Sequence, residues 1–435
     1  MAAGPRVIDR LAAAAAHIFY RIDAIGGLPD SGPLILLPNH PNALLDPALV
    51  IATAGRPVRF LAKSTLFTGA FAPLLLAADA IPVYRRQDGA PVDRNDEAFA
   101  AVDAALAQGE AICIFPEGIS HSSGRLEPLR TGAARMALAA ATKGVNVRLV
   151  PVGINLESKT SFRSRATVAY GPPFAVAPAA AGSEAEGVKA LTAGIAAHMR
   201  SLLVEADPRS DAELVARVDR LYTSARLQPE DPQSALARRR AIADALHRLR
   251  LERPDWYDAA LIQLRRYDDR LRRFGLADRA LDYDVSTPAA RAFLAREVPI
   301  ACLLSPVAAA ALLVFAVPYL LTALVAKLSR DMDVTASAKV VAGAAIYGAW
   351  SVLLSMVAAR FLGMLPGLIV FAMLPGLAVA GLFAIERESA AWQTARSWLI
   401  LRSARETTRS RLKRQRAELA DVLEQVNDWM NVRLP

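Results

Sequence analysis

The sequence is poor in the residues on which covalent and metal-dependent enzymes rely. Its 435 residues include two cysteines and five histidines, and no group of His, Cys and carboxylate residues has the spacing of a zinc site. Neither cysteine lies among the basic groups that make a thiol reactive. A Gly-x-Ser-x-Gly elbow and a Gly-x-x-x-x-Gly-Lys phosphate loop are also missing. These absences argue against serine, cysteine, zinc and P-loop enzymes, and we expect neither a metal nor a cofactor.

Charged residues are scarce in the C-terminal third, where three long apolar stretches follow one another. They cover roughly Val298–Ala326, Val340–Ala359 and Phe361–Ile385, and each reaches the roughly 18–20 residues that cross a bilayer. The third contains Pro366, Pro375 and several glycines, which predicts a kinked or re-entrant segment. We therefore expect two full crossings, an even number that keeps the flanking parts of the chain on one side.

The net charge of +9 is carried mainly by arginines, which cluster beside the apolar stretches. Such clusters are typical of positive-inside topology and of attraction to anionic lipid, and we favour a lipid bilayer over nucleic acid as the partner. Met1–Tyr20 has Asp9 and Arg10 where a signal peptide would be apolar, so an amphipathic helix is expected there. The sequence thus predicts an integral protein of the inner, cytoplasmic membrane, with the region before Val298 on the cytoplasmic side. It leaves the oligomeric state open.

Between residues 26 and 205, short apolar runs alternate with helical patterns. Helices are expected over Asp96–Gln108, with Asn95 as N-cap, and over Arg130–Lys143. This alternation predicts an α/β fold with a mostly parallel sheet flanked by helices, followed by a helical region and C-terminal transmembrane helices. The expected strands are 34–37, 58–62, 80–84, 111–115, 147–152 and 166–170. The expected divisions are an N-terminal amphipathic helix (1–25), the α/β domain (26–205), a helical connecting region (206–297), membrane helices (298–388) and a basic amphipathic C-terminal helix (389–435).

Polar side chains follow four of the predicted strands at the point where each strand ends. His40 follows the first strand, Lys63 the second and Glu117 the fourth, while Arg85 and Arg86 follow the third. In open α/β sheets, ligands bind just outside the carboxyl ends of the strands. A base, a carboxylate and several cations at one edge suit an acceptor that carries both a hydroxyl and a phosphate.

His40 and Asp46 are the candidate proton-transfer pair. A neutral imidazole is the natural base near pH 7, and a carboxylate on its other nitrogen fixes the tautomer. Pro41 favours an extended backbone at His40. We predict that His40 takes a proton from a hydroxyl, which then attacks an activated acyl group directly in a ternary complex. The alternative is a loop histidine beside a helix-capping Asp46, with Lys63 and Arg85 as solvated cations.

Four short blocks occur in an order that is typical of one family of enzymes. They are Asn39-His40 with Asp46, Ile81-Pro82-Val83-Tyr84-Arg85, Phe115-Pro116-Glu117-Gly118 and Val150-Pro151-Val152-Gly153. Over residues 26–175 the chain resembles the glycerol-phosphate and lysophospholipid acyltransferases, whose 1-acylglycerol-3-phosphate acyltransferase-like domain carries these blocks. The resemblance implies roles for six residues. It implies catalysis by His40 and Asp46, binding of the phosphorylated acceptor by Arg85, Glu117 and Gly118, and support of acyl-donor binding by Pro151.

The blocks depart from the family pattern in two places. Five residues, Pro41–Leu45, separate His40 from Asp46, one more than the commonest spacing in that family. Ser120 occupies a position at which the bacterial lysophosphatidate enzymes usually have arginine. Together with the membrane helices, these features look more like the fungal-type glycerol-3-phosphate/dihydroxyacetone-phosphate acyltransferases. Phosphate binding is then expected to depend more on Arg85, Lys63 and Arg130.

The resemblance implies a membrane-bound O-acyltransferase of phospholipid biosynthesis. It would move a fatty acyl group from acyl-CoA or acyl carrier protein to glycerol 3-phosphate or 1-acylglycerol 3-phosphate. Two alternatives remain: another lysophospholipid acceptor, and a catalytically silent membrane scaffold or lipid-transport partner on the same fold. The apolar stretch Leu66–Ala77 is expected either to dip into the bilayer or to form a buried helix of the α/β layer.

Overall fold

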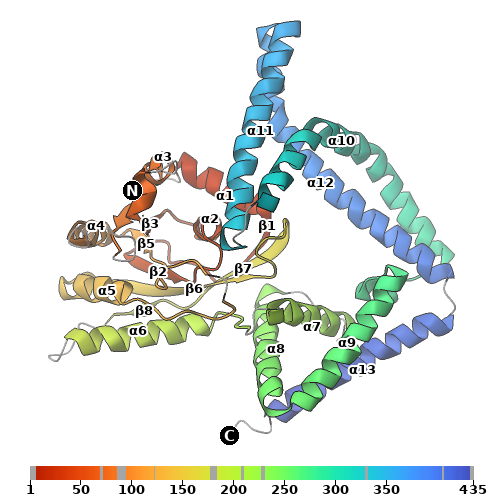
Figure 1. Cartoon of the computed structure of the whole chain (residues 1–435), viewed down its shortest axis with the longest axis horizontal. Helices are drawn as coiled ribbons and strands as arrows, with labels where there is room; N and C mark the ends of the chain where they lie inside the picture. Colours follow the sequence, from red (N-terminus) through yellow and green to blue (C-terminus); the bar gives the residue numbers. More distant parts are fainter. Residues whose placement is uncertain are drawn as a thin grey trace. The chain divides into compact units, whose positions relative to one another are not determined.

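The computed structural model describes most of the chain, which divides into two units (Figure 1). Unit 1 comprises Met1–Ala216, Glu230–Asp244 and Asp331–Ser337, and unit 2 comprises Arg217–Pro229, Ala245–Arg330 and Ala338–Pro435. Arg86 lies outside the described residues. The structure describes residues 6–68, 72–85, 95–121, 123–176, 184–206, 210–226, 231–328, 332–403 and 406–431.

Unit 1 is built on an eight-stranded sheet with the order β1-β7-β6-β2-β5-β3-β4, with β8 paired to β6. All pairings along this order are parallel except that of β6 with β7, and β8 is also antiparallel to β6. The predicted fold class, a mostly parallel sheet flanked by helices, is therefore confirmed. The strands are β1 (Tyr20–Ile25), β2 (Leu34–Pro38), β3 (Val58–Lys63), β4 (Ile81–Val83), β5 (Ala111–Cys113), β6 (Arg148–Leu156), β7 (Ser164–Tyr170) and β8 (Phe174–Ala175).

The main core of unit 1 lies where three helices pack with the central strands β2, β5 and β6. All five residues of β2 are buried, as a continuous apolar run in a central parallel strand requires. Two more helices, α1 and α2, pack against each other. The core helices are α4 (Asn95–Ala107), α5 (Gly132–Thr142) and α6 (Glu184–Arg200), and the other pair is α1 (Val7–Phe19) and α2 (Leu45–Thr53).

Three local features differ from the sequence-based expectations. Tyr20–Ile25 forms a strand in the range expected for the N-terminal amphipathic helix, which ends at Phe19. The expected strand at 166–170 is present as part of β7, but it runs antiparallel to β6. Asn95, expected as the N-cap, is the first residue of α4, and its side chain pairs with the backbone of Tyr84: Tyr84 N donates to Oδ1 (2.9 Å) and Nδ2 donates to Tyr84 O (2.7 Å). This pairing fixes the end of β4, directly before Arg85.

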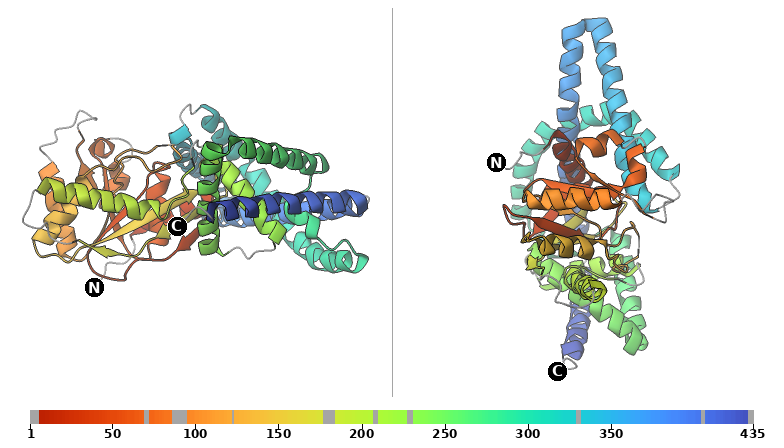
Figure 2. Two further views of the ribbon diagram at one scale, coloured as in Figure 1. Left: turned by 90° about the horizontal axis from the view of Figure 1, so that it is seen from below. Right: turned by 90° about the vertical axis from the view of Figure 1, so that its left-hand side faces the viewer.

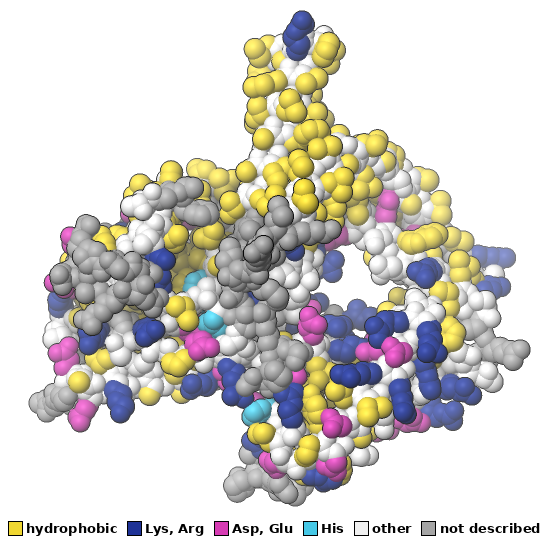
Figure 3. Space-filling model, viewed as in Figure 1, with side chains coloured by type: hydrophobic (Ala, Val, Ile, Leu, Met, Phe, Trp, Pro, Cys, Tyr) yellow, Lys and Arg dark blue, Asp and Glu magenta, His cyan; other side chains and the backbone are white. Residues whose placement is uncertain are grey.

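Unit 2 is helical, and the parts of α7 and α8 beyond Ala216 and Asp244 belong to it. Three of its helices contain segments long and apolar enough to cross a membrane: Thr287–Val325, Lys339–Leu362 and Met364–Ser403. The last two run side by side as a hairpin (Figure 2). On the face shown in Figure 3, most of the coloured side chains of this hairpin are hydrophobic, with basic side chains at its tip. The helices are α7 (Ser210–Arg226), α8 (Pro232–Glu252), α9 (Pro254–Phe274), α10 (Thr287–Leu328), α11 (Met332–Leu362), α12 (Met364–Ser403) and α13 (Glu406–Asn431).

Most of the third apolar stretch lies in α12, which is continuous from Met364 to Ser403 and contains Pro375 in its interior. Its first two residues, Phe361 and Leu362, end α11, and Gly363 separates the two helices. The structure thus shows a continuous helix after Gly363, and a re-entrant path of this stretch through a bilayer stays a prediction. Gly367 and Gly381 are points of close approach: a Cβ on Gly381 would lie 2.1 Å from that of Ala311 in α10. A kink at Pro375 and the number of membrane crossings stay predictions.

Candidate active site

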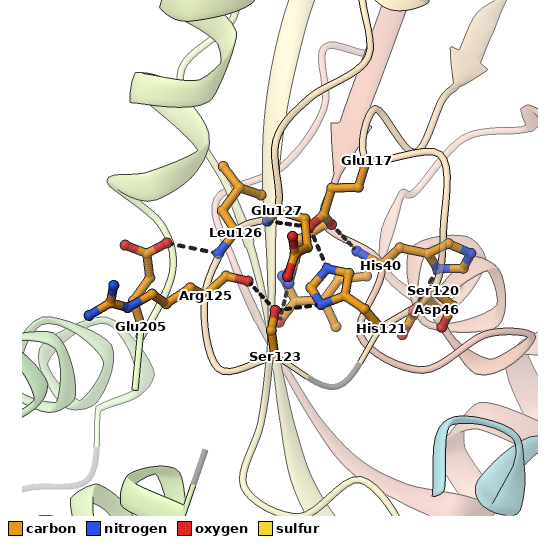
Figure 4. A network of polar contacts seen from close by, with 12 residues as sticks. His40, Asp46, Glu117, Ser120, His121, Ser123, Arg125, Leu126, Glu127 and Glu205 are labelled. Carbon is orange, nitrogen blue, oxygen red and sulfur yellow. Dashed lines mark hydrogen bonds and ion pairs between the residues drawn. The ribbon is translucent and has the colours of Figure 1, made fainter. Parts of the chain in front are cut away.

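The parallel strands β2, β3, β4 and β5 bring the predicted site residues to one edge of the sheet. β2 and β3 both pair with β5, and β3 pairs with β4, so the carboxyl ends of all four point the same way. His40 follows β2, and Glu117 follows β5. Lys63 is the last residue of β3 and lies opposite Val83 of β4, two residues before Arg85. Figure 4 shows that His40, Asp46 and Glu117 belong to one polar network.

His40 and Asp46 form a direct pair. His40 Nδ1 lies 2.8 Å from Asp46 Oδ2, and the same oxygen accepts a hydrogen bond from the backbone N–H of Asn42 (2.6 Å). Asp46 is fully buried in the first turn of α2, whereas the His40 side chain remains 19% exposed and stacks on Phe115, with 4.0 Å between ring centroids. A carboxylate acceptor keeps the proton on Nδ1, so Nε2 is the nitrogen that can accept a proton from substrate.

Burial raises the pKa of the Asp46 carboxyl above its ordinary value. The hydrogen bond and charge of His40, the backbone N–H of Asn42 and the charge of Lys159 oppose this effect. Asp46 Oδ1 is buried and has no hydrogen-bond partner among the described residues. The stabilisation of a negative charge on Asp46 therefore comes mainly through Oδ2, the atom that contacts His40.

Glu117 holds the backbone of the catalytic loop. It is 1% exposed, and its Oε1 accepts the N–H of His40 (2.8 Å). Its Oε2 accepts the N–H of Glu127 (2.8 Å) and also contacts His121 Nε2. A buried carboxylate with this many partners fixes the positions of the groups around it. Acceptor binding by Glu117, which the resemblance implies, stays a prediction.

Gly118 lies between two of the predicted phosphate-binding arginines. Its backbone has φ +72°, and a Cβ there would lie 3.2 Å from Arg130 Cγ, so a side chain would be strained and crowded. Arg85 Nη1 donates to the carbonyl of Gly118, and Arg130 N donates to Pro116 O (2.7 Å). The second and third sequence blocks therefore meet at Gly118.

Pro151 lies within the sheet instead of at its edge. It is buried in β6 opposite Leu37 of β2, and its carbonyl accepts the N–H of Gly171 (2.9 Å). Its ring also occupies the space beside Gly171, where a Cβ would lie 2.8 Å from Pro151 Cγ. A part for Pro151 in acyl-donor binding stays a prediction.

Several residues of the network carry no strong sequence signal. Asn42 is buried, and its Nδ2 donates to Tyr20 OH (2.6 Å), which in turn donates to Lys159 O (2.6 Å). Lys159 Nζ donates to the carbonyl of His121 (2.8 Å). The four-residue spacing of Glu117 and His121 was a local signal for their contact, but the partners of Asn42 lie far away in the sequence.

Replacing Glu117 with glutamine is expected to lower kcat for the acyl transfer proposed below by roughly 10–100-fold, the equivalent of one hydrogen bond to a charged group. The amide keeps one acceptor oxygen and places an NH₂ group at the other position, so it can accept the N–H of His40 or that of Glu127 but not both, and the loop is loosened. Steady-state kinetics in detergent would measure kcat and the acceptor KM separately.

Glu205→Gln is the matched control for this change. Glu205 also accepts a backbone N–H, that of Leu126 (2.9 Å), but makes no described contact with His40. We expect its kcat to stay within about twofold of wild type. A rise in acceptor KM for Glu117→Gln at constant kcat would instead favour direct binding of the acceptor by Glu117.

The fold and the site together define a class of enzyme. A histidine oriented by a buried carboxylate, beside arginines at the ligand edge of a parallel sheet, is suited to deprotonating a hydroxyl. The described residues hold no group of three or more His, Cys, Asp or Glu side chains placed to bind a metal ion.

Comparison with known proteins shows what the part of the chain that holds this site is similar to. Residues 21–155 match the family model described as Acyltransferase. Glycerol-3-phosphate O-acyltransferase 1 of Saccharomyces cerevisiae is 35% identical over 125 residues, which are 27% of this chain and 16% of that protein. Glycerol-3-phosphate O-acyltransferase 2 of the same yeast is 40% identical over 84 residues, 19% of this chain and 11% of that protein. The match thus spans less than a fifth of the length of either yeast relative.

A solved structure is also similar. It is the 1-acyl-sn-glycerophosphate (LPA) acyltransferase PlsC from Thermotoga maritima, 19% identical, with 45% of this chain and 78% of that chain covered and a TM-score of 0.35. The matches to the family model and to the yeast enzymes show that the chain carries an acyltransferase domain. The family resemblance predicted from the four sequence blocks is confirmed.

Proposed function

We propose that the chain is a membrane-bound O-acyltransferase of phospholipid biosynthesis. Its acceptor is glycerol 3-phosphate or 1-acylglycerol 3-phosphate, and its donor is acyl-CoA or acyl carrier protein. The observation that carries this proposal is the His40–Asp46 pair, 2.8 Å between Nδ1 and Oδ2, at the same sheet edge as Arg85 and Lys63. The relatives named glycerol-3-phosphate O-acyltransferases support the same acceptor class.

The proposed reaction needs no covalent enzyme intermediate. His40 Nε2 takes the proton of the acceptor hydroxyl as its oxygen attacks the carbonyl carbon of the acyl thioester. A carbon–oxygen bond forms and the carbon–sulfur bond breaks, and the departing thiolate takes up the proton. Asp46 stabilises the imidazolium that exists between these two transfers.

Arg85 and Arg130 are the proposed phosphate ligands. Both lie beside Gly118, and a guanidinium binds a phosphate through paired N–H donors. Lys63, at the end of the neighbouring strand, adds a further positive charge.

The apolar helices support attachment to a bilayer, with the catalytic unit on the cytoplasmic side. Leu74 and Leu76 of α3 (Ala72–Ala77) are 55% and 68% exposed, so this helix is not buried in the α/β layer as one expectation had it. Exposed leucines on a short helix favour contact with lipid over water. Residues 69–71 of the expected segment lie outside the described residues.

The experiment that tests the acceptor compares glycerol 3-phosphate with glycerol, using purified full-length protein and labelled acyl donors. We expect the phosphorylated acceptor to be preferred in kcat/KM. Arg85→Gln is expected to lower kcat/KM for glycerol 3-phosphate by roughly 10–100-fold through KM, while leaving the slow reaction with glycerol unchanged.

Arg59→Gln is the matched control, because Arg59 lies on the same strand as Lys63 but near its amino end, paired with Glu110 (3.2 Å). It should leave the preference for phosphate intact. Equal rates with glycerol and glycerol 3-phosphate would remove the role assigned to Arg85. Preference for another lysophospholipid would point to a different acceptor, and no transfer from any donor would favour a catalytically silent scaffold.

A further inference from the structure

The loop between His40 and Asp46 contains a residue in an uncommon backbone conformation. Ala43 has φ +42°, and the other described non-glycine residues with positive φ are Asp79 and Arg163. This left-handed region disfavours residues with a Cβ, and alanine lacks the short polar side chain that lets asparagine and aspartate adopt it. Contacts from outside the loop must therefore hold Ala43 in place.

The segment after Glu117 supplies these contacts. The N–H of Ala43 donates to Ser120 Oγ (2.9 Å), and the N–H of the next residue, His121, donates to the carbonyl of His40 (3.1 Å). Two successive residues thus bind the start and the middle of the catalytic loop. Glu117, which accepts the N–H of His40, anchors the same segment from its other end.

The conformation of Ala43 decides where Asp46 lies. The residue before it, Asn42, donates its N–H to Asp46 Oδ2 (2.6 Å), and Leu45 N donates to Asn42 O (3.1 Å). The N–H of Asp46 points back to the carbonyl of Ala43 (3.4 Å), which begins α2. A change of backbone at Ala43 would therefore shift the first turn of α2 and the carboxylate that contacts His40.

We propose that Ser120 is a positioning residue that holds the five-residue loop between His40 and Asp46 in the conformation that brings the two side chains together. Its hydroxyl holds Ala43 in the left-handed conformation, so that the longer loop still returns Asp46 to Nδ1 of His40. The left-handed Ala43 and the serine at position 120 are then two parts of one arrangement. The inference rests on the proposed acyl transfer for its kinetic readout.

The test is a double-mutant cycle with Ser120→Ala and Ala43→Gly in the full-length protein. Ser120→Ala is expected to lower kcat about tenfold with acceptor KM unchanged, because the loop is misplaced and the acceptor contacts are intact. Glycine adopts positive φ without a Cβ penalty, so Ala43→Gly should return the kcat of Ser120→Ala to within about threefold of wild type. Ser120→Thr keeps the hydroxyl and should also stay within about threefold.

Ser164→Ala is the control for loss of a serine hydroxyl that contacts the backbone. Ser164 Oγ donates to the carbonyl of Ser158 (2.6 Å), away from the loop, whereas Ser120 Oγ accepts the N–H of Ala43. Equal losses from Ser120→Ala with and without Ala43→Gly would overturn the proposal, as would an unchanged kcat in Ser120→Ala.

Thermal unfolding of the four proteins of the cycle separates this inference from the proposed function. These are wild type, Ser120→Ala, Ala43→Gly and the double variant. Coupling predicts that Ser120→Ala lowers Tm more in the wild-type background than in the Ala43→Gly background. If wild type transfers no acyl group, the proposed function fails, but equal Tm shifts in both backgrounds would still refute the coupling of Ser120 and Ala43.

Discussion

Replacing His40 with alanine is expected to lower kcat for acyl transfer by about 10³-fold, within the range that a general base contributes. Nε2 of His40 is the proposed proton acceptor, and Asp46 holds the opposite nitrogen at 2.8 Å. Removal of the ring leaves the acceptor's phosphate contacts in place, so its KM should change little. Steady-state assays with labelled acyl donor and saturating glycerol 3-phosphate would measure both constants.

His198→Ala is a close control for this change. His198 belongs to the same unit and also stacks on a phenylalanine, Phe174, with 4.3 Å between ring centroids. It lies on α6 and bonds the carbonyl of Gly194 instead of a carboxylate. Loss of this histidine should leave kcat within about twofold of wild type.

Retention of a third or more of the wild-type rate in His40→Ala would mean that another group takes the proton. His121 is the nearest imidazole in the polar network, but both of its ring nitrogens already have partners, Glu117 and Ser123. A substitute base would therefore have to release one of these contacts.

The sheet edge could be predicted because each strand carries its own signal. The buried apolar run of β2 ends directly before Asn39 and His40, and β5 ends close before Glu117, so the parallel rule places both polar groups together. The antiparallel direction of β7 could not be predicted, because an apolar run predicts a buried strand but not whether it is parallel or antiparallel to its neighbour. β1 was missed because Arg21 and Asp23 interrupt its apolar pattern at the edge of the sheet.

The contacts that orient the catalytic loop depend on pairs far apart in the chain. Glu117 and Ser120 bind His40 and Ala43 across 77 residues each, through a backbone N–H that any amino acid except proline would offer. The amino acid at position 40 or 43 therefore does not indicate which distant side chain accepts its backbone N–H. The two departures from the family pattern, the longer loop and Ser120, were visible in the sequence, but only the geometry of Ala43 connects them.

The same network explains how the candidate site accommodates two separate buried carboxylates. Glu117 and Asp46 are both fully or almost fully buried, which is costly unless donors surround them. Each accepts a backbone N–H and contacts one histidine ring. The two histidines therefore differ in role through their surroundings: His40 has a nitrogen left for substrate, and His121 is held in the supporting segment.

Replacing Asp46 with asparagine is expected to lower kcat by about 10³–10⁴-fold, although the side chain keeps its shape. Oδ2 contacts both His40 Nδ1 and the N–H of Asn42, so one atom of the amide must take both contacts. With the amide oxygen there, both hydrogen bonds remain, but the negative charge that stabilises the imidazolium is lost. With the NH₂ group there, Nδ1 must accept a hydrogen bond, the proton moves to Nε2, and the imidazole can no longer take a proton from the acceptor. Kinetic assays would show this as a fall in kcat with little change in acceptor KM.

The stability of Asp46→Asn separates this effect on His40 from unfolding. Burial raises the pKa of Asp46, which means that its negative charge is costly in the folded state. The neutral amide removes that cost, so Tm should equal or exceed that of wild type. Asp9→Asn is the matched control: Asp9 is also buried, at 6% exposure, and accepts hydrogen bonds from Arg6, so its loss should lower Tm and spare kcat. An Asp46→Asn protein with kcat within tenfold of wild type would contradict the role assigned to the Asp46 carboxylate.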